Sequence, residues 1–233
     1  MRRFLKPAFW IRRSAGILRG IDARLFGADF AQYHRELKRV VLDAACQSLL
    51  DVGCGQQSPV HSFSRQIPYT VGLDVHAPSI ERSRQEGIHS EYRTAEITDL
   101  ASQFPPHSFD SVVALDVLEH FTKEDGNRLI DAMESVARKQ VVVFTPNGMV
   151  YQPPEPGNPF QEHLSGWTAE EMRLRGYEVI GIAGWKPLRG AYVLPRWRPH
   201  WFWRRLSLMT ERRFESRPDR AFQLLCVKRI PTR

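Results

Sequence analysis

The chain has 233 residues, of which 42% are hydrophobic, 11% aromatic and 25% charged. This length suits one well-packed domain with extensions, and the composition excludes a disordered tail protein, a collagen-like chain and a disulfide-stapled miniprotein. No run approaches the roughly 18 to 20 apolar residues that a membrane-spanning helix needs. The three cysteines (46, 54 and 226) show no CxxC pair and no metal-ligand spacing, so we expect a reducing cytosol and no metal site.

The positive charge is concentrated at the two ends of the chain. The net charge is +7, yet residues 25–185 hold 13 cations and 22 anions, whereas residues 1–24 carry +6 and residues 186–220 carry +7. An enzyme that binds duplex nucleic acid more often carries positive charge around its active site, which makes nucleic acid an unlikely partner here. Cations mixed with tryptophans favour an anionic surface such as a membrane.

The first part of the chain alternates helix and strand. Apolar residues at helical spacing predict an amphipathic helix between Phe30 and Ala44. A short apolar strand over 48–52 then leads into a glycine turn, and Ser58 with Pro59 is typical of an N-cap and a first helical position. A second strand is expected over 69–74, followed by a helix that Pro78 opens.

The alternation continues to residue 145 and then stops. Further strands are predicted at 89–93, 109–115 and 141–144, with a helix beginning after Thr122. Five prolines between 146 and 160 predict an extended loop. A short helix capped by Thr168 and Glu171 and two last strands, 177–182 and 222–228, complete the pattern.

This pattern predicts an α/β fold: a Rossmann-like, doubly wound, mostly parallel seven-stranded sheet with helices on both faces. We expect one domain over residues 30–233, preceded by a basic extension over 1–29. An aromatic and basic insertion over 184–221 separates the last two strands, and a connection of that length usually carries function.

The glycine turn after the first strand predicts a nucleoside site. Gly53 and Gly55 remove side chains where the chain leaves the strand, so that a ligand can lie against bare backbone. Asp74 ends the second strand, where a carboxylate can accept hydrogen bonds from both hydroxyl groups of a ribose. A dinucleotide fold would prefer a glycine near Ser58, and Asp51 suits a cationic ligand end. The residues therefore favour S-adenosylmethionine over NAD.

Five segments resemble the motifs of the class I S-adenosylmethionine-dependent methyltransferases. They are LLDVGCG (49–55), VGLDV (71–75), AEITDL (95–100), FDSVVALDVLEHF (109–121) and VVVFTPN (141–147). The last is similar to the fifth-strand segment of the subgroup that contains quinone-biosynthesis O-methyltransferases, and the resemblance covers roughly residues 45–182. It implies transfer of a methyl group from S-adenosylmethionine, leaving S-adenosylhomocysteine, to oxygen of a small-molecule or lipid-linked acceptor.

The resemblance also implies a role for individual residues. Gly53, Cys54 and Gly55 would pass the methionine part of the cofactor, with Asp51 near its amino group. Asp74 would bind the ribose. The adenine would lie against Val75, Glu96 and Ile97, and Asp116 would face the methionine part and the acceptor. Glu96 stands where the family more usually has aspartate, and Asp99 lies three residues further on.

Two histidines are candidates for the catalytic base. His120 follows the fourth strand, and His163 follows the proline-rich loop, where the family often places contacts to the acceptor. Ligands bind at such strand ends in open α/β sheets, and histidine titrates near neutral pH. The alternative for each is a packed histidine bonded to backbone. For Trp167 we expect a place in the core.

The insertion combines Trp197, Trp201 and Trp203 with Arg204 and Arg205. Tryptophan with arginine is the composition of an interfacial anchor, and the N-terminal segment has a similar, less regular pattern. The alternatives are a cap on the acidic core or a dimer interface. We therefore expect a cytoplasmic protein, with docking on the inner face of the membrane as one hypothesis. Lys6, Pro7 and Arg12 interrupt any apolar core of a signal peptide.

Three other functions stay open at this stage. An RNA methyltransferase would use the basic ends as its footprint, but residues 116–119 read Asp-Val-Leu-Glu, not the Asn-Pro-Pro-Tyr of a base-methylating enzyme. A non-catalytic module that binds S-adenosylmethionine is disfavoured by the intact motifs. An NAD-dependent dehydrogenase shares the fold, and calorimetry with both cofactors separates it from a methyltransferase.

Overall fold

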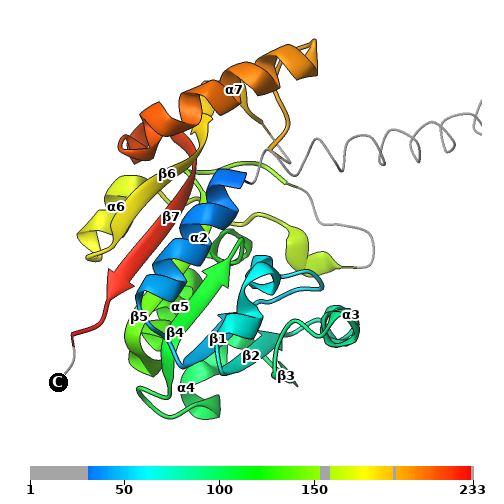
Figure 1. Ribbon diagram of the computed structural model, residues 1–233, viewed down its shortest axis with the longest axis vertical. Coiled ribbons are helices and arrows are strands. Elements are labelled where there is room, and N and C mark those ends of the chain that lie inside the picture. The colour runs from blue at the N-terminus through cyan, green and yellow to red at the C-terminus, as the bar shows by residue number, and fades with distance from the viewer. Residues whose placement is uncertain (1–30, 153–157, 191–192, 232–233) are drawn as a thin grey trace, which may run out of the picture.

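The computed structural model describes residues 31–152, 158–190 and 193–231, so the predicted extension over 1–29 lies outside the described residues. Seven strands form one sheet in the order β3-β2-β1-β4-β5-β7-β6 (Figure 1). The strands are β1 (Ser48–Val52), β2 (Tyr69–Asp74), β3 (Glu91–Thr94), β4 (Phe109–Leu115), β5 (Ala137–Pro146), β6 (Glu178–Trp185) and β7 (Ala221–Arg229). The helices are α2 (Ala31–Asp43), α3 (Ala77–Glu86), α4 (Leu100–Gln103), α5 (Lys123–Val136), α6 (Ala169–Leu174) and α7 (His200–Glu215).

One described strand runs against the others. Strands β1 to β5 pair in parallel, whereas β7 lies between β5 and β6 and is antiparallel to both. The prediction of a mostly parallel, doubly wound sheet of seven strands is therefore confirmed. The carboxyl ends of the parallel strands form one edge of the sheet, and the reversed β7 begins at that same edge.

Alternate residues of the strands divide the core into two layers. In β5, Val141 and Val143 pack with α4, α5 and α6, whereas Val142 and Phe144 pack with α2 on the other face. Figure 1 shows α2 in front of the sheet and α4 and α5 behind it. Both faces of the strands are buried, which explains the apolar runs at residues 112–115 of β4 and 141–144 of β5.

The helix predicted after the glycine turn is much shorter than a covering α-helix. Ser58 caps it as expected, but the chain forms only two 3₁₀ turns, Pro59–Ser62 and Ser64–Gln66. This geometry brings Val60, Phe63 and Ile67 into the layer beneath α2. The tighter turn places residues three apart on the same side, which suits the spacing of Val60 and Phe63.

The predicted insertion forms α7, a helix of 16 residues that packs on the edge strand β6. Two glycines permit the close approach: a Cβ atom at Gly181 would lie 2.1 Å from Phe214 O, and one at Gly184 would lie 2.5 Å from Ser207 O. Trp167 is buried in the core, as predicted. Among the described helices, none has the length and apolar character to cross a bilayer.

Candidate active site

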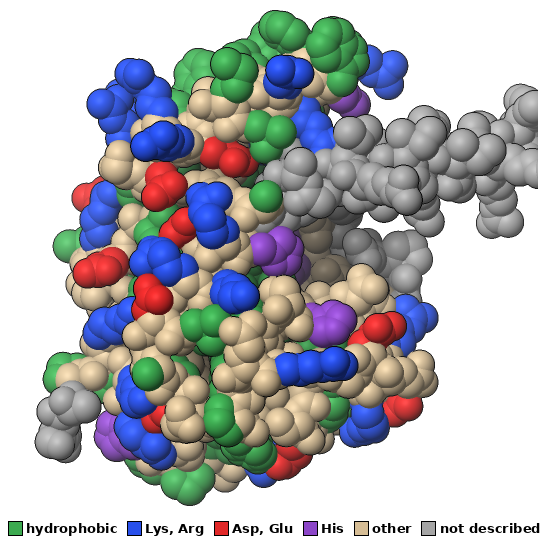
Figure 2. Space-filling view, in the orientation of Figure 1, with side chains coloured by type: hydrophobic (Ala, Val, Ile, Leu, Met, Phe, Trp, Pro, Cys, Tyr) green, Lys and Arg blue, Asp and Glu red, His purple; other side chains and the backbone are tan. Residues whose placement is uncertain are grey.

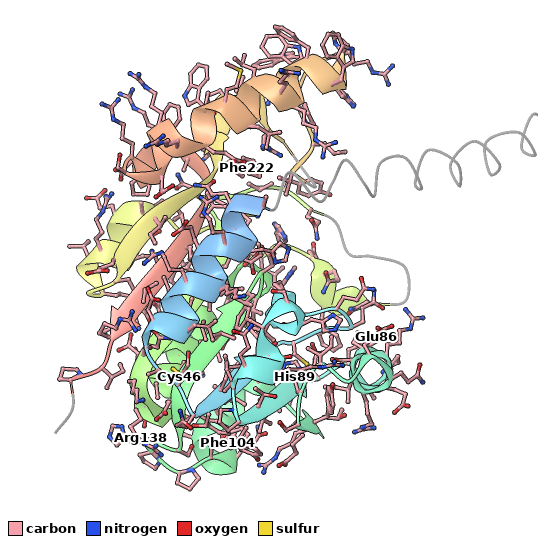
Figure 3. The ribbon with its side chains drawn as sticks, in the orientation of Figure 1. Cys46, Glu86, His89, Phe104, Arg138 and Phe222 are labelled. Atoms are coloured by element: carbon pink, nitrogen blue, oxygen red, sulfur yellow. The ribbon has the colours of Figure 1, made fainter. Side chains whose placement is uncertain are left out.

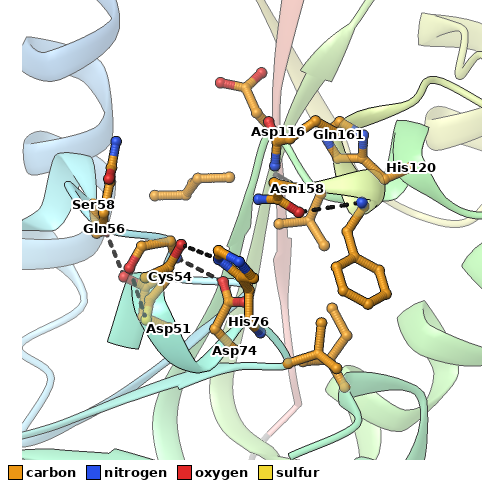
Figure 4. A pocket seen from close by; sticks show the side chains of 18 of the residues that line it. Asp51, Cys54, Gln56, Ser58, Asp74, His76, Asp116, His120, Asn158 and Gln161 are labelled. Atoms are coloured by element: carbon orange, nitrogen blue, oxygen red, sulfur yellow. Dashed lines mark hydrogen bonds between the residues drawn. The ribbon is translucent and has the colours of Figure 1, made fainter. Parts of the chain in front are cut away.

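A cavity of about 720 Å³ lies at the carboxyl ends of β1, β2 and β4. We call it the first cavity, and its volume is within the roughly 300–1,000 Å³ range of small-molecule sites. Figure 4 shows Asp51, Asp74 and Asp116 around it, each from a different strand end. The cavity is lined by nine of the predicted site residues, eight for the cofactor and one candidate base. They are Asp51, Gly53, Cys54, Gly55, Asp74, Val75, Ile97, Asp116 and His120.

The glycine turn is held by the neighbouring strand. The amide groups of Gly53 and Cys54 both donate to Leu73 O, at 2.7 and 3.0 Å. Gly53 and Gly55 have φ values of +70° and +57°, a region that glycine adopts without strain. A Cβ atom at Gly55 would meet no atom within 4 Å, so its backbone faces open space in the cavity.

Asp74 organises the second strand end. One carboxylate oxygen accepts from Gly55 N and the other from His76 N, both at 2.8 Å. These bonds join the glycine turn to the end of β2. Each oxygen keeps a lone pair for a further donor, which is what a ribose with two adjacent hydroxyl groups supplies.

Asp51 is almost fully buried and has two side-chain partners that the sequence analysis did not identify. Ser58 Oγ lies 2.5 Å and His89 Nε2 lies 2.9 Å from the same carboxylate oxygen. His89 comes from the segment before β3, 38 residues away. No local pattern predicts this pair, because a parallel sheet brings the two segments together.

Asp116 lies directly after β4 and lines the first cavity. Its φ of +55° is unusual for a residue with a side chain, and its amide donates to Phe144 O at 2.9 Å. Enclosure by protein raises the pKa of its carboxyl group, and a hydrogen bond with Glu119 opposes that rise.

Glu119 was not predicted, although it follows Asp116 by only three residues. Its side chain is 2% exposed and accepts from Thr145 Oγ1 at 3.0 Å. Burial raises its pKa well above the usual value, and the charge of Asp116 adds to the rise. The sequence signal that could have identified Glu119 is a pair of acidic residues spaced three apart just beyond a strand end.

A second cavity of about 210 Å³ adjoins the first and shares Asp116, His120 and Gln161 with it. His163 lines this second cavity and not the first. The structure thus brings the two histidines together, with ring centroids 5.0 Å apart. Burial lowers the pKa of both imidazoles, which favours their neutral form at pH 7.

Glu96 is the predicted residue that the structure leaves outside both cavities. Its side chain is exposed, whereas the adjacent Ile97 is buried and lines the first cavity. Its contact with adenine stays a prediction. Asn147 of the fifth-strand motif has a structural task, because its amide donates to the carbonyl groups of Pro218, Asp219 and Ala221 and so ties β5 to the start of β7.

Comparisons with known proteins agree on one family. A family model described as a methyltransferase domain matches residues 50–145. An uncharacterised methyltransferase of Mycobacterium tuberculosis is 29% identical over 150 residues, which cover 60% of this chain and 70% of that protein. A ubiquinone biosynthesis O-methyltransferase of Neisseria meningitidis is 28% identical over 150 residues, which cover 62% of this chain and 58% of that enzyme.

A solved structure supports the fold. The S-adenosylmethionine-dependent methyltransferase of Archaeoglobus fulgidus superposes with a TM-score of 0.56 at 15% identity, covering 89% of this chain and 99% of that one. The strand order, the glycine turn and these matches lead to one conclusion. Residues 50–145 match a methyltransferase domain, and the chain has the fold of the S-adenosylmethionine-dependent methyltransferases.

Proposed function

We propose that the protein transfers the methyl group of S-adenosylmethionine to a hydroxyl oxygen of a small or lipid-linked acceptor held in the second cavity. The observation that carries the proposal is the shared wall: Asp116 and His120 line both cavities. Methyl transfer requires the acceptor atom to lie in line with the methyl group, and two adjoining cavities give each reactant its own place. The ubiquinone biosynthesis relatives support oxygen as the methylated atom.

The first cavity fits the cofactor, which supplies a methyl group on a cationic sulfur. Bare backbone at Gly55 leaves room for the methionine part, whereas the space beside Gly53 is filled by Val117. The buried carboxylate of Asp51 suits the ammonium group of the cofactor. Asp74 is the proposed ribose ligand. Val75 and Ile97 offer apolar surface to the adenine.

His120 or His163 is the proposed base that takes the proton of the acceptor hydroxyl. Both imidazoles are held by backbone, since His120 Nδ1 lies 3.0 Å from Glu162 O and His163 Nδ1 lies 2.6 Å from Val150 O. A carbonyl oxygen only accepts, so Nδ1 carries the hydrogen and Nε2 is free to accept. His120 has the better position, because it faces both cavities.

A lipid-linked acceptor is supported by the surface of α7. Trp201 and Met209 are 71% and 74% exposed, and Phe202 is also exposed. Figure 2 shows apolar side chains gathered over this helix, with basic side chains beside them. Indole rings next to arginine suit the headgroup region of an anionic bilayer. We propose that α7 docks the enzyme on such a surface.

Calorimetry followed by a labelling experiment tests the enzyme and its acceptor class. We expect S-adenosylhomocysteine to bind the purified chain and NAD not to bind. With radioactive S-adenosylmethionine and cell extracts, we expect label in small molecules of the organic phase. Label in RNA alone would overturn the acceptor proposal, and the absence of S-adenosylhomocysteine binding would overturn the function.

Co-sedimentation with liposomes tests the membrane proposal separately. We expect binding to vesicles that contain phosphatidylglycerol, weaker binding at high salt, and weak binding to neutral vesicles. Trp201→Ala with Met209→Ala should reduce binding. Leu174→Ala is the matched control, because Leu174 is 82% exposed but lies on α6. No binding to anionic vesicles, or equal loss in the control, would end the proposal.

A further inference from the structure

The wall between the two cavities gathers three groups with metal-binding chemistry. Among the described residues, Glu119, His120 and His163 each offer one ligand atom, and these atoms lie within 4.8 Å of one another. Glu119 and His120 follow β4, whereas His163 lies ahead of α6. The amides of Leu164 and Ser165 donate to Glu119 O at 2.7 and 3.1 Å, which fixes the two segments together.

The histidines are oriented as metal ligands usually are. A metal-binding imidazole generally donates its other N–H group to a carbonyl or carboxylate oxygen, which selects the tautomer and fixes the ring. Here Glu162 O and Val150 O engage the two Nδ1 atoms. Each neutral ring then has its lone pair on Nε2, a common ligand atom for metals in proteins.

The carboxyl groups at the site have no cationic partner in the part of the chain that the structure describes. Glu119 is 2% exposed, its side chain accepts from Thr145 Oγ1, and no lysine or arginine forms an ion pair with Glu119 or Asp116 among the described residues. Burying a carboxylate without a cationic partner costs free energy, and a second carboxylate nearby increases that cost. A divalent cation would offset both charges.

The second cavity supplies room and a further unsatisfied group. Gln223 is 3% exposed and lines it, and its Oε1 has no hydrogen-bond partner among the described residues. Buried polar atoms without partners are rare and often indicate a ligand or water. This atom is independent of the three clustered residues and lies on β7.

We propose that Glu119, His120 and His163 bind a divalent transition-metal cation, such as Mn²⁺, Fe²⁺, Co²⁺ or Zn²⁺, between the two cavities. Two imidazoles with one carboxylate favour these ions over Mg²⁺ and Ca²⁺, which prefer oxygen ligands. Three protein ligands leave a coordination position open, as in catalytic metal sites. The proposal departs from the absence of a metal site expected from the cysteine spacing.

The task of the cation rests on the proposed function, whereas its binding does not. An acceptor oxygen in the open position would be held next to Asp116, at the wall that both cavities share. With the cation bound, both Nε2 lone pairs are ligands and neither histidine is the base. The cation would then lower the pKa of the bound hydroxyl group, and the Asp116 carboxylate at the same wall would take its proton.

Metal titration of the chelator-treated full chain tests binding without any acceptor. We expect Zn²⁺ and Mn²⁺ to bind with one-to-one stoichiometry in calorimetry. Glu119→Gln and His163→Ala should each weaken binding at least about 100-fold, since even partners outside the ligand shell are worth 10–100-fold. His61→Ala is the matched control, because His61 is exposed on the first 3₁₀ turn. Absence of saturable binding, or equal weakening in the control, would overturn the proposal.

Two further measurements keep the outcome decisive. The visible spectrum of the Co²⁺-loaded wild-type chain should show a low-symmetry site with nitrogen ligands, and a spectrum of aqueous Co²⁺ alone would overturn the proposal even if a variant fails to fold. S-adenosylhomocysteine binding is measured on the same metal-free sample. If this product binds but metal does not, the metal site falls and the methyltransferase function stands. If metal binds but S-adenosylhomocysteine does not, the metal site stands and the methyltransferase function falls.

Discussion

The two ends of β4 carry aspartates in opposite situations. Asp110, near the start of the strand, accepts from Gln47 N at 2.9 Å and pairs with Arg138 and Lys139 at 3.0 and 3.2 Å. Burial alone would raise its pKa, but these hydrogen bonds and positive charges lower it. Asp116, just past the other end, has no cationic partner among the described residues, and its pKa is raised.

This difference distinguishes two edges of the sheet. At the edge formed by the amino ends of the parallel strands the charges are paired, whereas the two cavities lie at the edge formed by their carboxyl ends. Figure 3 labels Arg138 at the first edge and Phe222, which lines the second cavity, at the opposite one. A charge that is fully paired stabilises the fold, whereas charges left without partners, with shifted pKa values, gather where ligands bind. The predictions that follow test whether the two edges can be altered independently.

The largest effect is expected for Asp116→Asn. This substitution removes the charge that faces both cavities, so we expect kcat/KM for methyl transfer to fall about 100-fold or more. Urea unfolding should show unchanged or increased stability, since a carboxylate close to Glu119 is neutralised. If the variant keeps wild-type turnover, methyl transfer does not take place at the wall that the two cavities share.

Asp74→Ala tests the binding of the cofactor at the same edge. The variant loses the acceptor of Gly55 N and His76 N together with the proposed ribose ligand. We expect the Kd of S-adenosylhomocysteine to rise about 10- to 100-fold in calorimetry, as for hydrogen bonds to a charged group. Glu96→Ala is the comparison. A change below about threefold would follow from its place outside the cavity lining, whereas a larger rise would support the predicted contact with adenine. Equal effects would refute this ranking.

Asp110→Ala should act on stability alone. Loss of the bonds to Gln47 N, Arg138 and Lys139 is expected to lower the free energy of unfolding by about 1–3 kcal/mol. Asp131→Ala removes a solvent-exposed pair with Arg175 and should cost less than about 1 kcal/mol. S-adenosylhomocysteine affinity, measured on the folded variant, should not change. A parallel loss of affinity would show that the two edges are coupled.

The smallest effect concerns two thiols, one at each edge. Burial raises the pKa of Cys46 and of Cys54, helped by Asp110 in the first case and by Asp51 and Asp74 in the second. Both should react slowly with a disulfide reagent at pH 8 and rapidly in urea. S-adenosylhomocysteine should slow Cys54 further and leave Cys46 unaffected, because only Cys54 lines the first cavity. Rapid labelling of Cys54 in the complex would contradict its place in the site.

The sheet, the glycine turn and most of the first cavity could be predicted from the amino-acid sequence alone. These features depend on neighbours along the chain: an apolar run forms a buried strand, and Gly53 and Gly55 turn directly after it. Asp74 and Asp116 could be assigned to the same edge because parallel strands end together. Strand boundaries were less accurate, since β5 begins at Ala137 and not at Val141.

The polar partners around the two cavities depend on contacts between distant segments, which became visible in the fold. His89 reaches Asp51 over 38 residues through a hydrogen bond between their side chains. His163 lies near Glu119 over 44 residues, because the adjacent amides of Leu164 and Ser165 donate to Glu119 O, and no periodicity records either contact. The pKa shifts of Glu119 and His163 depend on burial in three dimensions. Local sequence specifies which element forms, whereas the packing of distant elements decides which polar groups meet and which stay without a partner.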